Sequence, residues 1–327
     1  MKHLKTILKA GLSLGLLGYL IYQAEPYKIL EVLGKIWFEG GIIYLSIATC
    51  LFILSLFILS KRWQVLVSGY GFQIPTRSLF KYYLIGLFFN NFLPTAIGGD
   101  VLRIYNLIQE TGNRTISFAS VLTERILGII STLILTITSI IILRDNLEND
   151  LLLYIAIAML AFVISLFYIA FSKKLLGPIQ SLCDHLFVFR LGERIQKFLN
   201  AIRFYADSKL IFFKILLLSL ISQGLIITKT YFLARAVQIE VDLIYMFLVV
   251  PISFLITMLP SINGIGFRDG AYVVLLAKIG VSKAAALSLS FLTLLIPMLI
   301  SISGGILFML QKKVIREEGV KIAEKGI

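Results

Sequence analysis

Two similar interruptions break the apolar sequence of this 327-residue chain: LPTAIGGD at 93–100 and LPSINGIG at 259–266. Each ends a long apolar stretch and precedes a short apolar piece, 101–111 or 270–279, which is too short to cross a bilayer alone. Each region is therefore predicted to form a helical hairpin, broken by proline and glycine, that returns to the side from which it entered. The alternative is that proline and glycine only kink two ordinary spanning helices.

The composition of the whole chain is typical of a membrane protein. Hydrophobic residues make up 58% and charged residues 15%, with a mean hydropathy of +0.93. Soluble domains average about 45–50% apolar residues and about 25% charged residues. Soluble enzymes, nucleic-acid-binding domains and disordered chains are excluded, so the net charge of +13 does not indicate a nucleic-acid partner. We expect a single all-α, polytopic integral membrane domain over 1–327.

The distribution of basic residues selects a topology. If 78–114 and 243–282 are both re-entrant, 22 basic residues lie inside and 7 outside, whereas two full crossings give 15 against 14. The positive-inside rule therefore predicts hairpins that enter from opposite faces, with both termini cytoplasmic, in the cell (inner) membrane. Six full transmembrane helices are expected in addition, near residues 6–24, 42–60, 116–143, 151–172, 211–234 and 284–310.

The interruptions belong to a weak internal repeat. They share Leu-Pro-[Thr/Ser]-x-x-Gly at an offset of 166 residues, and SVLT at 120–123 matches SFLT at 290–293 at an offset of 170. Because the predicted hairpins enter from opposite faces, the repeat units, at about 78–143 and 243–310, are expected to be inverted. Transporters commonly place their substrate sites where the broken helices of such repeats meet. Gly304-Gly305 is expected to permit close helix packing.

Charged side chains at membrane depth are the candidate functional groups, because charge there is costly. They are Asp100, Arg103, Glu124, Arg125, Arg268 and Asp269. The three arginines are predicted to bind the phosphate of an anionic headgroup, and the three carboxylates to orient them or to carry a coupling proton. The alternative is structural ion pairing, since each acid has a base within three positions. Lys229 is predicted to snorkel to the interface.

Small and amide residues at the interruptions complete the predicted substrate site, which includes Asn91, Asn263, Gly98, Gly99, Gly264 and Gly266. Exposed backbone N–H groups of the glycines would contact an anion at half-helix N-termini. The asparagines, Asn90 among them, are predicted to bond carbonyls freed by proline, and secondly to contact the headgroup. No catalytic, metal-binding or ATP-binding motif is present in the sequence, so neither a cofactor nor an enzymatic activity is expected.

The segment 173–210 is basic and amphipathic, and it is predicted to lie on the cytosolic side. Apolar residues recur in it mostly every three or four positions, with arginines and lysines between them. Interfacial helices on anionic lipid would show this pattern. A helical hairpin packed on the protein's own cytosolic surface would show it equally.

Three motifs, in order, resemble the transmembrane region of lysylphosphatidylglycerol synthases. They are FNNFLP with GGDVLR within 89–103, TERILG at 123–128, and LP with NGIGFRDGA within 259–271, and KRW at 61–63 also fits. The resemblance covers essentially the whole chain. Asp269 stands where glutamate is more usual in this family, which keeps the carboxylate but shortens its reach.

The resemblance implies a flippase-like transporter that moves a phospholipid or a lipid-linked anionic headgroup between leaflets. In bifunctional synthases a soluble C-terminal domain makes the aminoacyl lipid. No such activity is expected here, because only 311–327 follows the last predicted span. The alternatives are an accessory or transferase component of a lipid-modification or lipid-linked glycan pathway, and a membrane scaffold. Expected partners are anionic or isoprenoid-linked lipids, a second copy of the chain, or a lipid-synthesising enzyme.

Overall fold

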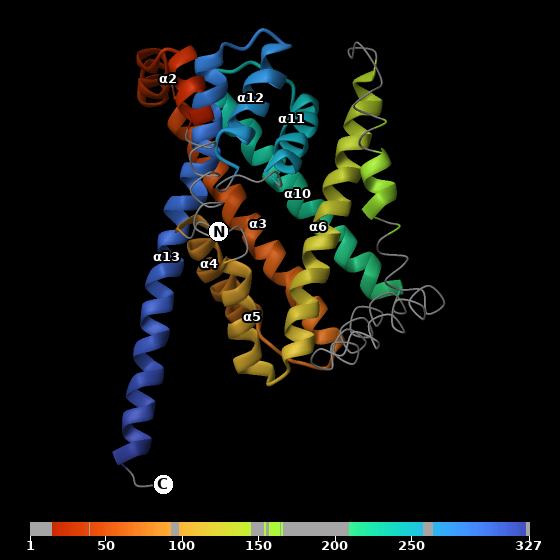
Figure 1. Ribbon diagram of the computed structural model, residues 1–327, viewed down its shortest axis with the longest axis vertical. Helices are drawn as coiled ribbons and strands as arrows, with labels where there is room; N and C mark the ends of the chain where they lie inside the picture. The colour runs from red at the N-terminus through yellow and green to blue at the C-terminus, as the bar shows by residue number, and fades with distance from the viewer. Residues whose placement is uncertain are drawn as a thin grey trace.

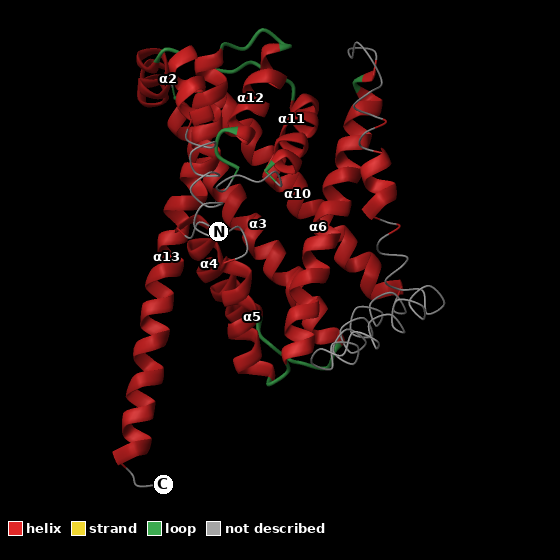
Figure 2. Cartoon of the chain, viewed as in Figure 1, coloured by secondary structure: helices red, strands yellow, loops and turns green. Residues whose placement is uncertain are grey.

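In a computed structural model of the protein, all regular structure among the described residues is helical (Figure 2). The described residues are 15–38, 40–92, 98–144, 154, 157–163, 165, 209–257 and 264–324. The predicted all-α class is therefore confirmed. Outside the described residues lie the first nine residues of the predicted span at 6–24, most of the predicted span at 151–172, the centres of both interruptions and nearly all of the basic segment 173–210.

Within the described part of the chain, four helices are long and apolar enough to cross a membrane. They are α3 (Gly41–Gly69), α6 (Arg114–Ile142), α10 (Lys209–Ala236) and α13 (Lys283–Glu324). Their positions agree with the predicted spans near 42–60, 116–143, 211–234 and 284–310. Hydroxyl side chains within them donate to carbonyls one turn earlier, as Ser60 Oγ does to the Leu56 carbonyl at 2.8 Å, which satisfies these polar groups without water.

Shorter helices flank each interruption in pairs. They are α4 (Thr76–Phe92) and α5 (Gly98–Thr111), and α11 (Leu243–Ile256) and α12 (Phe267–Ala277). Within each pair the two helices pack against each other. Figure 1 shows α5 towards the lower end of the molecule and α12 towards the upper end.

The helices fall into two sets of four, α3–α6 and α10–α13, and each set packs one of its short helices against the last long helix of the other set. Helix α4 packs against α13, and in the same way α11 packs against α6. Helix α5 packs against α6 as α12 packs against α13, while α3 and α10 pack along each other. A pseudo-two-fold relation between the two sets of four helices would produce these pairings.

The contact between α4 and α13 is a close backbone approach. A Cβ atom on Gly304 would overlap the carbonyl group of Leu84, and one on Gly305 would lie 2.7 Å from the ring of Phe88. The prediction that Gly304-Gly305 permits close helix packing is therefore confirmed. This contact joins the first pair of short helices to the last long helix.

Helix α2 (Pro26–Phe38) packs against α3 and α13 at the upper end of the molecule (Figure 1). It buries Ile29 and Ile36 and exposes Tyr27, Leu30 and Trp37. One cluster of buried apolar side chains lies mainly among α10–α13, and a second lies mainly among α3–α6. The groups described next lie within this packed interior.

Candidate functional site

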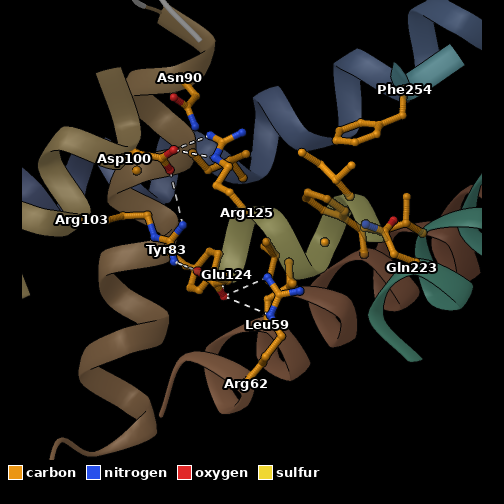
Figure 3. Close-up of a pocket in the computed structure, with 17 residues that line it drawn as sticks. Leu59, Arg62, Tyr83, Asn90, Asp100, Arg103, Glu124, Arg125, Gln223 and Phe254 are labelled. Carbon is orange, nitrogen blue, oxygen red and sulfur yellow. Dashed lines mark hydrogen bonds and ion pairs between the residues drawn. The ribbon is translucent and has the colours of Figure 1, made fainter. Parts of the chain in front are cut away.

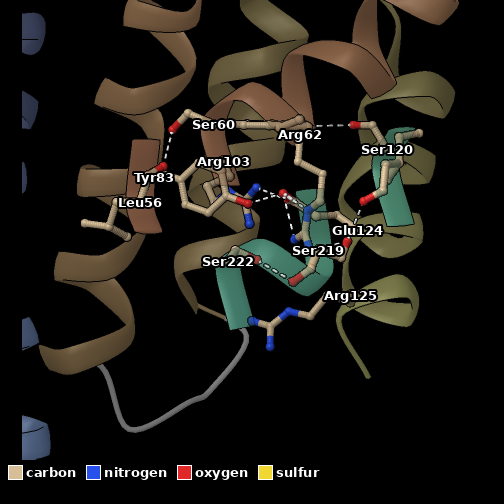
Figure 4. Close-up of polar contacts among 12 residues, drawn as sticks. Leu56, Ser60, Arg62, Tyr83, Arg103, Ser120, Glu124, Arg125, Ser219 and Ser222 are labelled. Carbon is tan, nitrogen blue, oxygen red and sulfur yellow. Dashed lines mark hydrogen bonds and ion pairs between the residues drawn. The ribbon is translucent and has the colours of Figure 1, made fainter. Parts of the chain in front are cut away.

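A buried carboxylate on α6, Glu124, is the centre of a network of charged side chains (Figure 4). Its Oε1 atom lies 3.0 Å from Nη2 of Arg62 on α3, and its Oε2 atom forms an ion pair with Arg103 on α5. The hydroxyl of Tyr83 on α4 also donates to Oε1. Three helices other than its own therefore satisfy this one carboxylate, as a buried charge requires.

Arg62 is a site residue that the sequence analysis did not include among its candidates. Its side chain is buried and points into the protein, where Nη1 donates to Ser219 Oγ on α10 at 2.9 Å. The position follows Phe52, Leu56 and Leu59 at helical spacing, and all four side chains line one cavity. That periodicity is the sequence signal that identifies Arg62 as a site residue.

Aromatic rings fix the orientation of Arg103. Its guanidinium carbon lies 3.7 Å from the ring centroid of Tyr83 and 4.3 Å from that of Trp63. Trp63 Nε1 donates in turn to Ser120 Oγ on α6 at 3.1 Å. Arg103 is thus held by stacking as well as by charge, which leaves it little freedom to follow a ligand.

Asp100, at the start of α5, joins this network to Arg125. Its Oδ2 atom accepts from Nε of Arg125 at 2.6 Å, and its Oδ1 atom lies 3.4 Å from Nη1 of Arg103. Adjacent residues on a helix point in different directions, which explains why Glu124 pairs with Arg62 and Arg103 on other helices instead of with Arg125. The predicted local pair Asp100–Arg103 is present, and Glu124–Arg125 is not among the ion pairs of the described residues.

These charges line a cavity of about 350 Å³ bounded by α3, α4, α5, α6, α10 and α11 (Figure 3). Asp100 and Arg125 lie on one side of it, and Gln223 and Phe254 on the other. The Arg125 side chain is 46% exposed, whereas those of Arg62, Arg103 and Glu124 are 5%, 8% and 2% exposed. Apolar side chains complete the wall, namely Phe52, Leu56, Leu59, Leu87, Ile129 and Ile226.

The first interruption supplies less free backbone than the sequence suggested. The N–H group of Gly99 donates to Asn90 Oδ1 at 2.8 Å, so an anion would have to displace this bond. A Cβ atom on Gly99 would overlap the Gly86 carbonyl, so glycine is required here for helix packing. Gly98 begins α5, and Asn91 Nδ2 is buried without a hydrogen-bond partner among the described residues. Contact of Gly98, Gly99 and Asn91 with a substrate stays a prediction.

The second interruption leads into a separate group of charges, here called the Asp269 cluster (Arg268, Asp269 and Ser290). Asp269 Oδ1 lies 2.6 Å from Arg268 Nη2 and accepts from Ser290 Oγ at 2.5 Å. Its Oδ2 atom accepts from the N–H group of Gly266 at 2.8 Å, which caps α12. Arg268 and Asp269 are both buried and neither lines the cavity at Glu124.

Of the other predicted contacts at this interruption, Gly264 adopts a left-handed conformation (φ +76°) that suits glycine. Asn263 lies outside the described residues. The structure thus brings Arg103 and Arg125 together around Asp100 and places Arg268 in a different cluster.

Lys229 is the clearest departure from expectation, because it does not snorkel to an interface. The residue, on α10, is 4% exposed, and its Nζ atom lies 5.3 Å from the ring centroid of Phe52. It lies within electrostatic range of Arg268, and no carboxylate among the described residues pairs with it. The sequence alone does not predict that this lysine is buried, because a lysine near the end of an apolar run can equally well reach water.

Comparison with known proteins places the chain among integral membrane proteins. The family model described as "Lysylphosphatidylglycerol synthase TM region" matches residues 6–304. The UPF0104 membrane protein PH1989 of Pyrococcus horikoshii is 25% identical over 307 residues, which cover 86% of this chain and 91% of that protein. A UPF0104 membrane protein of Methanothermobacter thermautotrophicus is 23% identical over 305 residues, covering 88% and 89%. No solved structure matches the chain.

Proposed function

The chain belongs to the family of the lysylphosphatidylglycerol synthase TM region, and from this premise we propose that it moves a lipid with an anionic headgroup across the cell membrane. It is an integral, multi-pass membrane protein. The headgroup enters the cavity beside Arg125, and its phosphate competes with Asp100 for that guanidinium. The acyl chains stay along the apolar wall. A phospholipid and an isoprenoid-linked lipid both fit this description.

The observation that carries the proposal is the half-exposed Arg125 in a cavity with an excess of positive charge. Three arginines, Arg62, Arg103 and Arg125, face two carboxylates, Asp100 and Glu124. An anion would neutralise the remaining charge, and guanidinium binds phosphate oxygens bidentately. Arg62 and Arg103 are held by Glu124 in the interior, so Arg125 is the arginine that a headgroup can reach.

The arrangement of helices supports alternating access as the transport route. The exchanged contacts of α4 with α13 and of α11 with α6, and the placement of α5 and α12 towards opposite ends, fit an inverted repeat with two re-entrant hairpins. In the proposed topology these hairpins accompany six full spans, and both termini are cytoplasmic. Rocking of one half against the other would open the cavity to each leaflet in turn.

Energetic coupling depends on the charge that moves. Each net elementary charge carried across the membrane gains or loses about 2.3 kcal/mol per 100 mV. In the proposed cycle Asp100 re-forms its ion pair with Arg125 when the headgroup leaves. The arginine therefore has an anionic partner both with and without bound lipid. Asp100, Glu124 and Asp269 serve to orient the arginines, and Asp100 is the carboxylate placed to exchange a proton with the cavity.

Leaflet exchange in proteoliposomes tests the proposal. Purified protein is reconstituted, and inward movement of fluorescent phosphatidylglycerol is followed by quenching of the outer leaflet. Arg125→Gln, which retains hydrogen bonding but not charge, is expected to lower the exchange rate at least about tenfold, since one charge-assisted phosphate contact contributes about 1.5–3 kcal/mol. Arg114→Gln, at an exposed position in the first turn of the same helix, is the matched control.

Two results would overturn the proposal. One is native protein that exchanges phosphatidylglycerol no faster than protein-free liposomes. The other is Arg125→Gln protein that exchanges the lipid as fast as the native and Arg114→Gln proteins. The second result would mean that the ion pairs around Asp100 have only a structural role.

A further inference from the structure

We infer that Lys229 and Arg268 form a second anion-binding site, in the α10–α13 half of the molecule, which takes one phosphate group. This inference deepens the proposed function and rests on it for the identity of the ligand as a lipid headgroup. The site itself rests on the burial and charge of Lys229, a residue that does not line the cavity at Glu124.

The first step is the position of Lys229 in the repeat. Lys229 lies seven residues before Ala236, the last residue of α10, and Arg62 lies seven residues before Gly69, the last residue of α3. Both residues are 4% exposed. The exchanged contacts of the two halves pair α3 with α10, so each half carries one buried base at the same distance from the end of its helix.

The second step is the difference in partners. Arg62 is paired with Glu124, which lies one turn after Ser120 on α6. The repeat aligns Ser120 with Ser290 on α13, and one turn after Ser290 stands Leu294. The carboxylate that would compensate Lys229 is therefore replaced by an apolar side chain.

The third step is the charge of the surroundings. Lys229 and Arg268 are two buried like charges within electrostatic range of each other, and the carboxylate that pairs with Arg268, Asp269, already accepts from Arg268, Ser290 and the Gly266 N–H group. The group therefore has a net charge of one positive unit. An uncompensated buried cation is expensive, so a buried anion at this place would be stabilised by both bases.

The fourth step connects the site to the cavity. Gln223 and Ile226 line the cavity from α10, and Lys229 follows Ile226 by three residues on the same helix face. Phe52, which also lines the cavity, carries the ring over which Lys229 Nζ lies. A headgroup released from Arg125 would thus meet Lys229 one turn further along α10, on the far side of Phe52.

The test measures equilibrium binding to the purified full chain in detergent, by calorimetry and by thermal unfolding. The probes are dioctanoyl phosphatidylglycerol, inorganic phosphate, and dioctanoylglycerol, which lacks a phosphate. Lys229→Met is expected to raise the Kd of one of the two phospholipid sites about tenfold or more and to reduce the rise in Tm that the phospholipid produces. Without ligand, Lys229→Met should unfold at the same or a higher temperature than native protein, because an uncompensated buried charge has been removed.

Matched variants define the controls. Lys214→Met changes an exposed lysine on the same helix and should leave Kd and Tm unchanged. Lys229→Arg keeps the charge and should retain phospholipid binding. Stronger binding of phosphatidylglycerol than of inorganic phosphate supports a lipid headgroup as the ligand, and equal binding supports a site for free phosphate.

Two outcomes would overturn the inference. One is a Lys229→Met variant that binds the phospholipid as tightly as native protein. The other is a ligand-free Lys229→Met variant that unfolds at a lower temperature, which would mean a purely structural lysine. Binding lost in Lys229→Met but no leaflet exchange by native protein would refute the proposed transport and leave the site intact. Leaflet exchange by native protein, together with unaltered phospholipid binding by Lys229→Met, would refute the site and leave the proposed transport intact.

Discussion

The two halves of the molecule share a packing pattern but treat their buried bases differently. In the α3–α6 half, Arg62 and Arg103 share the Glu124 carboxylate. In the α10–α13 half, Asp269 pairs with Arg268, and Lys229 has no carboxylate partner among the described residues. The comparison teaches that two halves with similar helix contacts can treat buried bases differently: one half shares a buried carboxylate between two arginines, and the other leaves a lysine without a carboxylate partner among the described residues.

The largest effect that the comparison predicts is the loss of the shared carboxylate. Glu124→Gln leaves Arg62 and Arg103 buried without a negative partner in contact with both, which should destabilise the protein by about 3–5 kcal/mol. Thermal unfolding in detergent would show a large fall in Tm. Glu31→Gln, which removes an exposed pair with Lys35, is the control and should have little effect. An unchanged Tm for Glu124→Gln would mean that the network does not hold the first half together.

The paired serines of the repeat give a more direct comparison. Ser290 donates to the Asp269 carboxylate at 2.5 Å, whereas Ser120 accepts from the neutral Trp63 Nε1 at 3.1 Å. Ser290→Ala should therefore cost about 1.5–3 kcal/mol of unfolding free energy and Ser120→Ala about 0.5–1.5 kcal/mol. Equal losses in reversible unfolding experiments would contradict the assignment of the charge-assisted bond to the second half.

Helix packing also distinguishes the halves. Gly304 permits α13 to touch the backbone of α4, and the position 170 residues earlier on α6 is Ile134. Gly304→Ala should destabilise by about 1–3 kcal/mol through overpacking. Gly224→Ala on α10, where a Cβ atom meets nothing within 4 Å, should be neutral or stabilising. Equal Tm values for the two variants would show that the α4–α13 contact can relax.

The smallest predicted effect restores the missing symmetry. Leu294→Glu places a carboxylate one turn after Ser290, as Glu124 follows Ser120, and should neutralise Lys229. Binding of dioctanoyl phosphatidylglycerol should weaken about tenfold, or about 1.4 kcal/mol. Leu294→Gln, of similar size without charge, should bind like native protein. Equal affinities of the two variants would argue against an electrostatic role for Lys229.

Much of the fold could be predicted because membrane helices are specified locally. A span needs about 20 apolar residues, and this property alone located α3, α6, α10 and α13. Proline and glycine located the two interruptions between short paired helices. The glycine pair Gly304-Gly305 also identified a close contact, although not its partner α4.

The partners of the buried charges could not be predicted in the same way. Glu124 pairs with Arg62 across 62 positions, and its neighbour Arg125 turns to Asp100. Such contacts depend on how distant helices pack. Arg62 and Lys229 lie near the ends of apolar runs, where a basic side chain can reach water as readily as it can be buried. Helical periodicity with the cavity-lining Leu59 and Ile226 is the signal that separates the two cases.

Headgroup selectivity of leaflet exchange tests the central claim most directly. Native protein in liposomes is offered fluorescent phosphatidylglycerol and fluorescent phosphatidylcholine with the same acyl chains and label. We predict that the protein accelerates exchange of phosphatidylglycerol about tenfold or more over phosphatidylcholine, because a tenfold preference requires only about 1.4 kcal/mol from the cationic cavity. Equal acceleration of both lipids, or no acceleration over protein-free liposomes, would contradict transport of an anionic headgroup.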